Sequence, residues 1–529
     1  GYGSFYEQFS RTPVSATYFA RDPAALNTRV PAHTIWGEAL AETGVVGISL
    51  FIMFLGVLLL PILSAFQEGK SYKEYFYPAT MLASLIGWLV AGIFYSYNSE
   101  FFWIVFFLYF IYGISVVGRN FSYSLTVGRL TRNKKFQLSI LFVIASFLIF
   151  FNLGKNHFIP WDEAIYAKIS KNIVESHNYL SMSWLPGKIW YEKPPLYMWL
   201  ASFVMSVAGF GELAARLPSA VFGLLTVLLV YLIGVKLFNK TVGFISALSI
   251  LTNIHFLYYS RASMLDVSVT FFITLSLYFY LIYLEKEKWM FIVLSGVSFG
   301  LGVMTKGVVG FIPLGIIFFF EIYRYLTKQQ KISRRRIIYS VLFLVSGGLI
   351  FMPWHLIMYH KFGFPFIKNY LVYHVIDRAT TVIEDKGRPF FWYLTVMKVS
   401  MRIWFIALIG SFGHTLYRVF RKSSKHVFLL IWFLTIFLLF SVSKSKLIWY
   451  IIPIYPVATL IVGDFIDIAI TYFVGKSKFV KSGYALKALI LYCLLIFSLF
   501  YLFLNREKVY TSDLTGSQAE LLIKKNQVY

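Results

Sequence analysis

Apolar segments long enough to cross a membrane recur along most of this chain. A transmembrane helix needs about 20 mainly apolar residues to cross a hydrocarbon core of about 30 Å. The sequence therefore predicts an all-α fold, a polytopic transmembrane helical bundle. A shorter apolar segment, 196–210, is expected to enter the membrane without crossing it. The expected spans are residues 45–65, 76–95, 101–118, 137–153, 213–235, 241–258, 264–284, 289–304, 307–325, 337–357, 393–413, 427–443, 447–468 and 484–504.

The composition agrees with a membrane protein and argues against a nucleic-acid partner. Only 14% of the residues are charged, whereas a soluble domain is nearer a quarter charged. The formal net charge of +25 comes from short basic clusters between apolar segments, where positive charge sets membrane orientation. A nucleic-acid-binding protein would gather its basic residues on one solvated face. We therefore expect membrane lipids, and no nucleic acid, among the partners.

The basic clusters alternate between successive loops, which predicts the orientation of the bundle. With residues 119–136 in the cytoplasm, the positive-inside rule places 1–44, the carboxylate-bearing loops and 358–392 on the outer side. The expected location is a bacterial inner membrane, with the active site on the periplasmic face. Three lysines fall on the outer side against the rule and need a local reason: Lys306, Lys444 and Lys446. The alternating basic clusters are Lys236/Lys240, Lys286/Lys288, Lys328/Lys331/Arg334/Arg335/Arg336, Arg418/Arg421/Lys422/Lys425 and Lys476/Lys478/Lys481.

The basic segment 119–136 also separates two blocks of different composition. We predict an N-terminal unit at 1–118, a cytoplasmic linker at 119–136, a membrane domain at 137–504 and a short outer tail at 505–529. Residue 1 is Gly, not Met, so the chain is expected to begin within a longer reading frame. The single cysteine, Cys493, has no partner for an intrachain disulfide.

The longest polar interruption in the hydrophobic middle of the chain begins at Pro160. Asp162 follows as a predicted helix N-cap. Ile165, Ile169 and Ile173 recur every four residues opposite a polar face, which indicates an amphipathic helix lying in the membrane surface. Asp162 is interpreted either as a plain cap or as a base that deprotonates an acceptor hydroxyl.

Charged residues precede the two prolines at 194 and 195. Pro194 and Pro195 stiffen the chain, so the direction of Glu192 and Lys193 relative to the next helix is fixed. Lys193 could bind a lipid phosphate as a point charge, and Glu192 could bind a divalent metal ion. The alternative is an interfacial salt pair.

Asp266 lies at the start of an otherwise apolar span. An ionisable group at such a depth is costly and is usually functional or paired. Arg261, one to two helical turns earlier, is the predicted partner of Asp266. Lys306 is expected in the same outer layer.

The segment 358–392 is too polar to span a membrane and too aromatic to be a free linker. We interpret it as a lid packed over the outer face. A second outer segment, Lys444-Ser445-Lys446, precedes Trp449-Tyr450; its lysines either bind phosphate or extend to the interface. The charged candidates of the lid are Arg378, Glu384, Asp385, Lys386 and Arg388.

An ordered set of motifs over residues 137–470 resembles the GT-C membrane glycosyltransferases, in particular the bacterial branch related to protein O-mannosyltransferases and the lipid A aminoarabinose transferase. The resemblance implies a polyprenyl-phosphate-linked sugar donor and an inverting transfer, on the periplasmic side, to a lipid, glycan or protein acceptor. The matching motifs are WDEAIYAKISKNI, YEKPPLYMWL, ELAARLPSAVFGLLTVLLVYLIGVKLF, RASMLDVSVTFF, TKG, PFFWYL and SKSKLIWYIIPIYP.

The same resemblance implies roles for individual residues. It makes Asp162 the catalytic aspartate with Glu163 beside it, and Asp266 a second functional aspartate. Glu192 matches a metal-binding glutamate, Lys193 a lipid-phosphate contact and Tyr450 a residue lining the donor site. Arg261 and Lys446 are further candidates for phosphate binding.

Two positions depart from the family pattern. Ile165 stands where the aminoarabinose branch has an arginine, and Lys386 stands where the family has a metal-binding histidine. Glu384 or Asp385 could replace that histidine around a divalent metal ion, or Lys386 could itself supply the positive charge to the substrate.

The N-terminal quarter is similar to the C-terminal end of the O-antigen ligase and polymerase family. The matching text is Gly1-Tyr2-Gly3-Ser4 followed by HTIWGEALAETGVVGISLFIMFL. The resemblance implies that His33 serves the transfer of a lipid-linked glycan, against the alternative of a surface histidine before a membrane helix. A fusion of ligase and transferase, and a lipid-linked-sugar flippase, are the competing interpretations of the whole chain.

Overall fold

The computed structural model describes residues 133–476 except 160, 186, 332, 384 and 385, together with 483–505 and 509. The chain divides into two compact units, residues 1–124 with 477–489 and residues 125–476 with 490–529. Apart from 483–489, the described residues belong to the second unit. His33 lies outside the described residues, and the predicted domain boundaries and ligase-like segment stay predictions.

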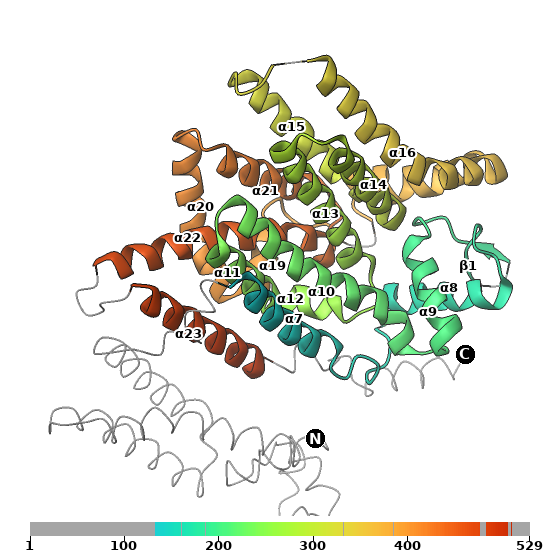
Figure 1. Cartoon of the computed structure of the whole chain (residues 1–529). Helices are drawn as coiled ribbons and strands as arrows, with labels where there is room; N and C mark the ends of the chain where they lie inside the picture. Colours follow the sequence, from blue (N-terminus) through green and yellow to red (C-terminus); the bar gives the residue numbers. More distant parts are fainter. Residues whose placement is uncertain are drawn as a thin grey trace, which may run out of the picture. The chain divides into compact units, whose positions relative to one another are not determined.

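The described part of the chain is helical and multi-pass, as predicted (Figure 1). Seven of its segments are long and apolar enough to cross a membrane, or eight if a bent pair counts as one more. A two-stranded antiparallel hairpin, β1 (Ser183–Leu185) and β2 (Lys188–Ile189), is the sheet found among the described residues. The seven segments are Glu212–Leu237, Leu265–Lys286, Trp289–Leu326, Arg334–Phe362, Ile403–Phe420, Ser424–Val442 and Ile448–Tyr472.

The helices take the labels of Figure 1. They are α7 (Lys134–Phe150), α8 (Asp162–Ser176), α9 (Leu196–Ala208), α10 (Glu212–Leu237), α11 (Lys240–Leu251), α12 (Ile254–Ser260), α13 (Leu265–Lys286), α14 (Trp289–Lys306), the 3₁₀ turn η2 (Gly307–Phe311), α15 (Ile312–Leu326), α16 (Arg334–Phe362), α17 (Phe364–Ile367), the π-helix η3 (Lys368–Asp377), α18 (Arg378–Thr380), α19 (Trp392–Met401), α20 (Ile403–Phe420), α21 (Ser424–Val442), the 3₁₀ turn η4 (Ile448–Ile454), α22 (Tyr455–Lys476) and α23 (Gly483–Leu504).

The 38-residue segment Trp289–Leu326 reverses direction in its middle. A Cβ added to Gly310 would lie 2.2 Å from the backbone nitrogen of Val303, although residues seven apart in a straight helix are about 10 Å apart. η2 thus folds back onto α14. The reversal agrees with the two separate spans expected at 289–304 and 307–325.

Two other expected spans are broken. The span expected at 241–258 bends by 69° between α11 and α12. There the Asn253 side chain accepts a hydrogen bond from the Phe256 amide and so starts a new helix. The span expected at 393–413 breaks at Arg402, whose φ of 46° is outside the helical region. Neither break has a Gly or Pro signal at its position.

Glycines allow the helices to pack closely. A Cβ at Gly243 would lie 2.6 Å from the carbonyl oxygen of Tyr231, and one at Gly300 would lie 2.5 Å from that of Gly347. These sites bring α11 against α10 and α16 against α14. Small residues at helix crossings let backbones approach in this way.

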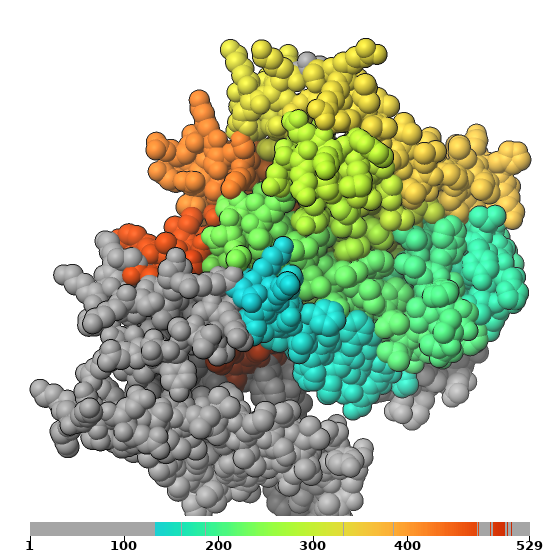
Figure 2. All heavy atoms as spheres, viewed as in Figure 1, coloured from blue at the N-terminus to red at the C-terminus, as the bar shows by residue number. Residues whose placement is uncertain are grey.

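Burial separates central helices from peripheral ones. The most apolar window of Ile448–Tyr472 is 83% buried, whereas that of α16 is 22% buried. Figure 2 shows the yellow atoms of α15 and α16 at the rim of the described residues. α22 therefore forms the core of the bundle, and α16 presents much of its apolar surface outward.

Candidate active site

α8 carries the predicted catalytic aspartate at its first position. The N-cap is Trp161, with a φ of 76° and no capping side chain, so the prediction that Asp162 is the cap was wrong. The reason is local: the chain enters the helix through a positive φ at Trp161. No hydrogen bond of the Asp162 carboxylate to another described residue is found. The half-buried carboxylate lies at the positive end of the helix dipole and is available to a substrate.

The apolar face of α8 is covered by protein. Ile169 and Ile173 are fully buried, and α8 packs on α9 and on β1. Protein and not lipid therefore covers this face, and the position of α8 in the membrane surface stays a prediction. Periodicity predicts an apolar face, but it does not tell whether lipid or another helix covers that face.

Glu163 holds three parts of the chain together. Its carboxylate accepts hydrogen bonds from Arg216 Nε at 2.8 Å and Nη2 at 3.2 Å. It also accepts from the backbone amides of Ser263 at 2.8 Å and Ile159 at 2.7 Å. Glu163 is buried and both of its oxygens are engaged. The geometry thus gives Glu163 a positioning role beside Asp162 in place of direct chemistry.

Asp266 pairs with Lys306 and not with Arg261. The Lys306 ammonium donates to the Asp266 carboxylate, and both side chains are buried. The ammonium also lies 4.8 Å from the centre of the Tyr450 ring, within range of a cation–π contact. This pairing is the local reason for a lysine that departs from the positive-inside pattern.

Arg261 makes different contacts from those predicted. Its guanidinium donates to the carbonyl oxygens of Leu148 at 3.2 Å and Ile149 at 2.7 Å. Both carbonyls belong to the last turn of α7, where carbonyl groups lack hydrogen-bond partners within the helix. The prediction that Arg261 is the partner of Asp266 was therefore wrong, because sequence proximity did not reveal that α14 brings Lys306 to that carboxylate.

The segment 378–388 is fastened to the loop 443–446. The amide of Ser445 donates to the carbonyl of Arg378 at 3.1 Å, and the amide of Lys446 to that of Lys386 at 3.0 Å. The Ser445 hydroxyl donates to Thr381 O at 2.9 Å and accepts from the Ile383 amide at 2.8 Å. The C-terminal part of the expected lid 358–392 is thus packed on the loop that leads into η4, which carries Tyr450.

This fastening positions the basic side chains of the loop. Arg378 donates to the Tyr450 hydroxyl at 3.0 Å. Lys446 is buried and donates to the carbonyl oxygens of Arg388, at 3.1 Å, and Ser443. Burial lowers the pKa of the Lys446 ammonium. The backbone carbonyl of Lys386 accepts one of the hydrogen bonds that hold the segment on the loop.

The charges of Lys306 and Arg378 also act on Lys193. The pKa of Lys193 is lowered to about 8, chiefly by burial; the Glu192 carboxylate opposes the shift, and the positive charges of Lys306 and Arg378 add to it. Three cations therefore act on one another beside Asp162 and Asp266. Such a cluster is suited to an anionic group such as a phosphate diester.

His374, which sequence reasoning missed, faces the predicted metal ligand Glu192. Its Nε2 lies 3.7 Å from a Glu192 carboxylate oxygen, and its Nδ1 is buried without a hydrogen bond to any described group. Burial, followed by the charges of Lys193 and Arg378, lowers the pKa of His374 to about 3. The imidazole is therefore neutral at pH 7 and able to bind a metal. The π-helical course of η3, which places it there, has no recognised sequence signal.

A small cavity lies beside Glu163. Glu163, Arg216 and Arg261 line it together with residues of the α7–α8 loop, and it has a volume of about 30 Å³. That is room for a water molecule and not for a sugar. It belongs to the structural framework around Glu163.

The helical fold is of the GT-C type, as comparison with solved structures shows. Two solved structures share it. The crystal structure of ArnT from Cupriavidus metallidurans bound to undecaprenyl phosphate has a TM-score of 0.56 at 19% identity and covers 69% of this chain and 76% of that one. The archaeal oligosaccharyltransferase AglB from Archaeoglobus fulgidus, in complex with an inhibitory peptide and a dolichol-phosphate, has a TM-score of 0.52 at 17% identity and covers 72% and 56%.

Sequence comparisons point to particular relatives. Residues 192–357 match the family described as dolichyl-phosphate-mannose-protein mannosyltransferase. A protein of uncharacterized function from Aquifex aeolicus is 31% identical over 63% of this chain and 64% of its own length. The undecaprenyl phosphate-alpha-4-amino-4-deoxy-L-arabinose arabinosyl transferase 2 of Proteus mirabilis is 26% identical over 64% of this chain and 61% of its own length. The chain thus spans less than two thirds of these relatives.

Proposed function

We propose that this chain is a glycosyltransferase that moves a sugar from a polyprenyl-phosphate donor to an acceptor at the membrane end marked by Asp162. The observation that carries the proposal is the juxtaposition of Asp162, a carboxylate available at a helix N-terminus, with the cations Lys193, Lys306 and Arg378. The similarity to the Proteus arabinosyl transferase and the fold shared with ArnT support it. The active side is the outer, periplasmic side of a bacterial inner membrane.

The reaction assigns separate work to the carboxylate and the cations. An acceptor hydroxyl attacks the anomeric carbon and gives its proton to Asp162, a general base. The bond between that carbon and the phosphate oxygen breaks with inversion, and polyprenyl phosphate leaves with the bonding electron pair. Lys193 and Arg378 stabilise the charge that develops on the phosphate. Lys306 holds Asp266 and the Tyr450 ring in place.

A divalent metal ion fits beside the phosphate site. Glu192 and His374 supply one carboxylate and one neutral imidazole, whose Nε2 lies 3.7 Å from a carboxylate oxygen. These are ordinary ligands for a transition metal ion. When bound, the ion would add positive charge to the phosphate site. Glu192 and His374, in place of the Glu384 or Asp385 expected from the sequence, are the proposed ligands.

The lipid-linked-sugar flippase is the second candidate. The test is to incubate a labelled polyprenyl-phosphate sugar with membranes that contain the full chain. We expect the label to leave the donor and polyprenyl phosphate to accumulate. Movement of intact donor between leaflets without cleavage would contradict the transferase and identify a flippase. The position of the label at the end of the reaction identifies the acceptor as lipid, glycan or protein.

A further inference from the structure

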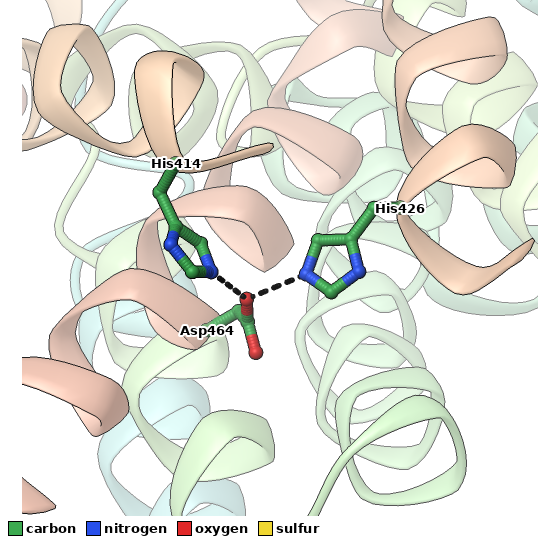
Figure 3. Close-up of side chains that lie close together, drawn as sticks. All are labelled: His414, His426 and Asp464. Atoms are coloured by element: carbon green, nitrogen blue, oxygen red, sulfur yellow. Dashed lines mark hydrogen bonds and ion pairs between the residues drawn. The ribbon is translucent and has the colours of Figure 1, made fainter. Parts of the chain in front are cut away.

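Three metal-ligating side chains meet away from the proposed active site. His414 lies on α20, His426 in the first turn of α21 and Asp464 on α22, and Figure 3 shows both imidazoles directed at the Asp464 carboxylate. Asp464 is nine residues, or about 13 Å along the helix axis, beyond Tyr455, where α22 begins next to η4. The α20–α21 connection carries the basic cluster 418–425, which the charge pattern places in the cytoplasm.

The spacing of the ligand atoms suits a shared cation. The same Asp464 oxygen lies 3.0 Å from His426 Nε2 and 3.6 Å from His414 Nε2, and one ligand atom from each residue lies within 4.8 Å of the others. Bonds of about 2.0–2.1 Å in a tetrahedral site require ligand atoms about 3.3 Å apart. Two of the three separations bracket that value, so small side-chain rotations are enough to form the site.

Hydrogen bonding between the three side chains does not by itself explain why they meet. Of the two histidines, only His426 is within hydrogen-bond distance of the Asp464 oxygen. His414 Nε2 is buried and has no hydrogen bond to any described group. A buried polar atom without a partner is unusual enough to require an explanation. A metal ion between the three side chains would satisfy it.

The surroundings of His426 support metal binding. Its Nδ1 lies 2.7 Å from the Ser423 hydroxyl, so a proton on Nδ1 can be donated to Ser423 while Nε2 is left to bind a metal. Such outer hydrogen bonds orient metal-binding histidines. Asp464 and His426 are both buried, and Asp467, one turn along α22, adds a second buried carboxylate held by Asn239 at 2.7 Å.

We propose that His414, His426 and Asp464 bind one divalent transition-metal ion, with Zn²⁺ the best match, and that the ion fastens α20, α21 and α22 at the end of the bundle opposite Asp162. Two imidazoles and one carboxylate are a usual zinc ligand set, and water completes the tetrahedron. On binding, the metal takes the place of the proton between His426 Nε2 and the carboxylate, and the neutral imidazole then carries its proton on Nδ1, where Ser423 accepts it. The ion is structural and distinct from one at Glu192 and His374.

The test measures metal binding by the purified full chain in detergent, after stripping with a chelator. Wild type is expected to regain Zn²⁺ and to show a higher Tm with it, and to give the intense visible absorption of tetrahedral Co²⁺. His426→Gln and His414→Asn should each bind one equivalent less and lose both the absorption and the Tm shift. The matched control is His360→Gln, which removes an exposed histidine of α16 and should behave as wild type.

Glu192→Gln separates the two metal sites, because it should keep the Co²⁺ absorption and the Tm shift. The proposal is overturned if His426→Gln and His414→Asn bind as much metal as wild type, or if wild type gives neither signal. His414 is partly exposed, so a folded His414→Asn protein keeps the test valid should His426→Gln fail to fold. Loss of the signals in Glu192→Gln alone would place the ion at the active site and would also contradict the proposal.

Discussion

At the scale of the residue, two buried ion pairs have different roles. Glu163 and Arg216 are saturated by hydrogen bonds and link α8 to α10 and to the α12–α13 turn. Asp266 and Lys306 form the second pair, against the Tyr450 ring. A saturated pair holds the framework, whereas the second pair lies beside the charges that would meet a phosphate.

Removing one member of the first pair should destabilise the protein strongly. Arg216→Leu leaves the Glu163 carboxylate buried without its counter-ion, which typically costs about 3–5 kcal/mol. Thermal unfolding in detergent should show a marked fall in Tm. Lys171→Ala removes an exposed i,i+4 pair with Glu175, and such a pair contributes little. An equal fall in the two variants would refute the framework role of Glu163 and Arg216.

Lys193 should make donor binding depend on pH. Its pKa is lowered to about 8, chiefly by burial, so its positive charge, and with it the attraction for phosphate, is lost as pH rises through about 8. We expect KM for the donor to rise above that pH in wild type. Lys193→Arg keeps its charge and should move the rise to higher pH. A KM profile identical in the two proteins would exclude Lys193 from phosphate binding.

At the scale of the element, short irregular pieces bring the site together. η3, α18 and the loop 443–446 place His374, Arg378 and Tyr450, and backbone hydrogen bonds fasten 378–388 to that loop. A long helix alone would not bring these side chains to one end of the bundle. The fastening therefore matters for activity more than for global stability.

Ser445→Ala tests the fastening. The change leaves the Ile383 amide and the Thr381 carbonyl without their shared hydroxyl partner, a loss of about 1–3 kcal/mol for a buried polar group. We expect transfer to fall at least several-fold through a looser Arg378–Tyr450 contact, while the protein stays folded and its Tm falls by only a few degrees. Ser424→Ala, at the start of α21, is the control. Unchanged transfer in Ser445→Ala would show that the loop does not position the site.

At the scale of the whole molecule, the sequence predicted the helical, multi-pass fold and the class of relatives. Hydropathy also located the two helices α14 and α15 within Trp289–Leu326, because apolar length is a direct physical signal. Contacts between distant elements were not predictable in this way. The Lys306 partner of Asp266, the cover of α9 over α8 and the approach of His374 to Glu192 all depend on packing between segments far apart in the chain.

The most direct test of the proposed mechanism compares Asp162→Asn with wild type for transfer from a labelled polyprenyl-phosphate sugar. Asparagine keeps the shape and removes the base, so we expect kcat to fall by about 10² to 10⁴-fold with the donor Kd and Tm unchanged. Glu175→Gln, an exposed change on the same helix, should keep full activity. Transfer by Asp162→Asn at the wild-type rate would contradict the assignment of Asp162 and with it the proposed mechanism.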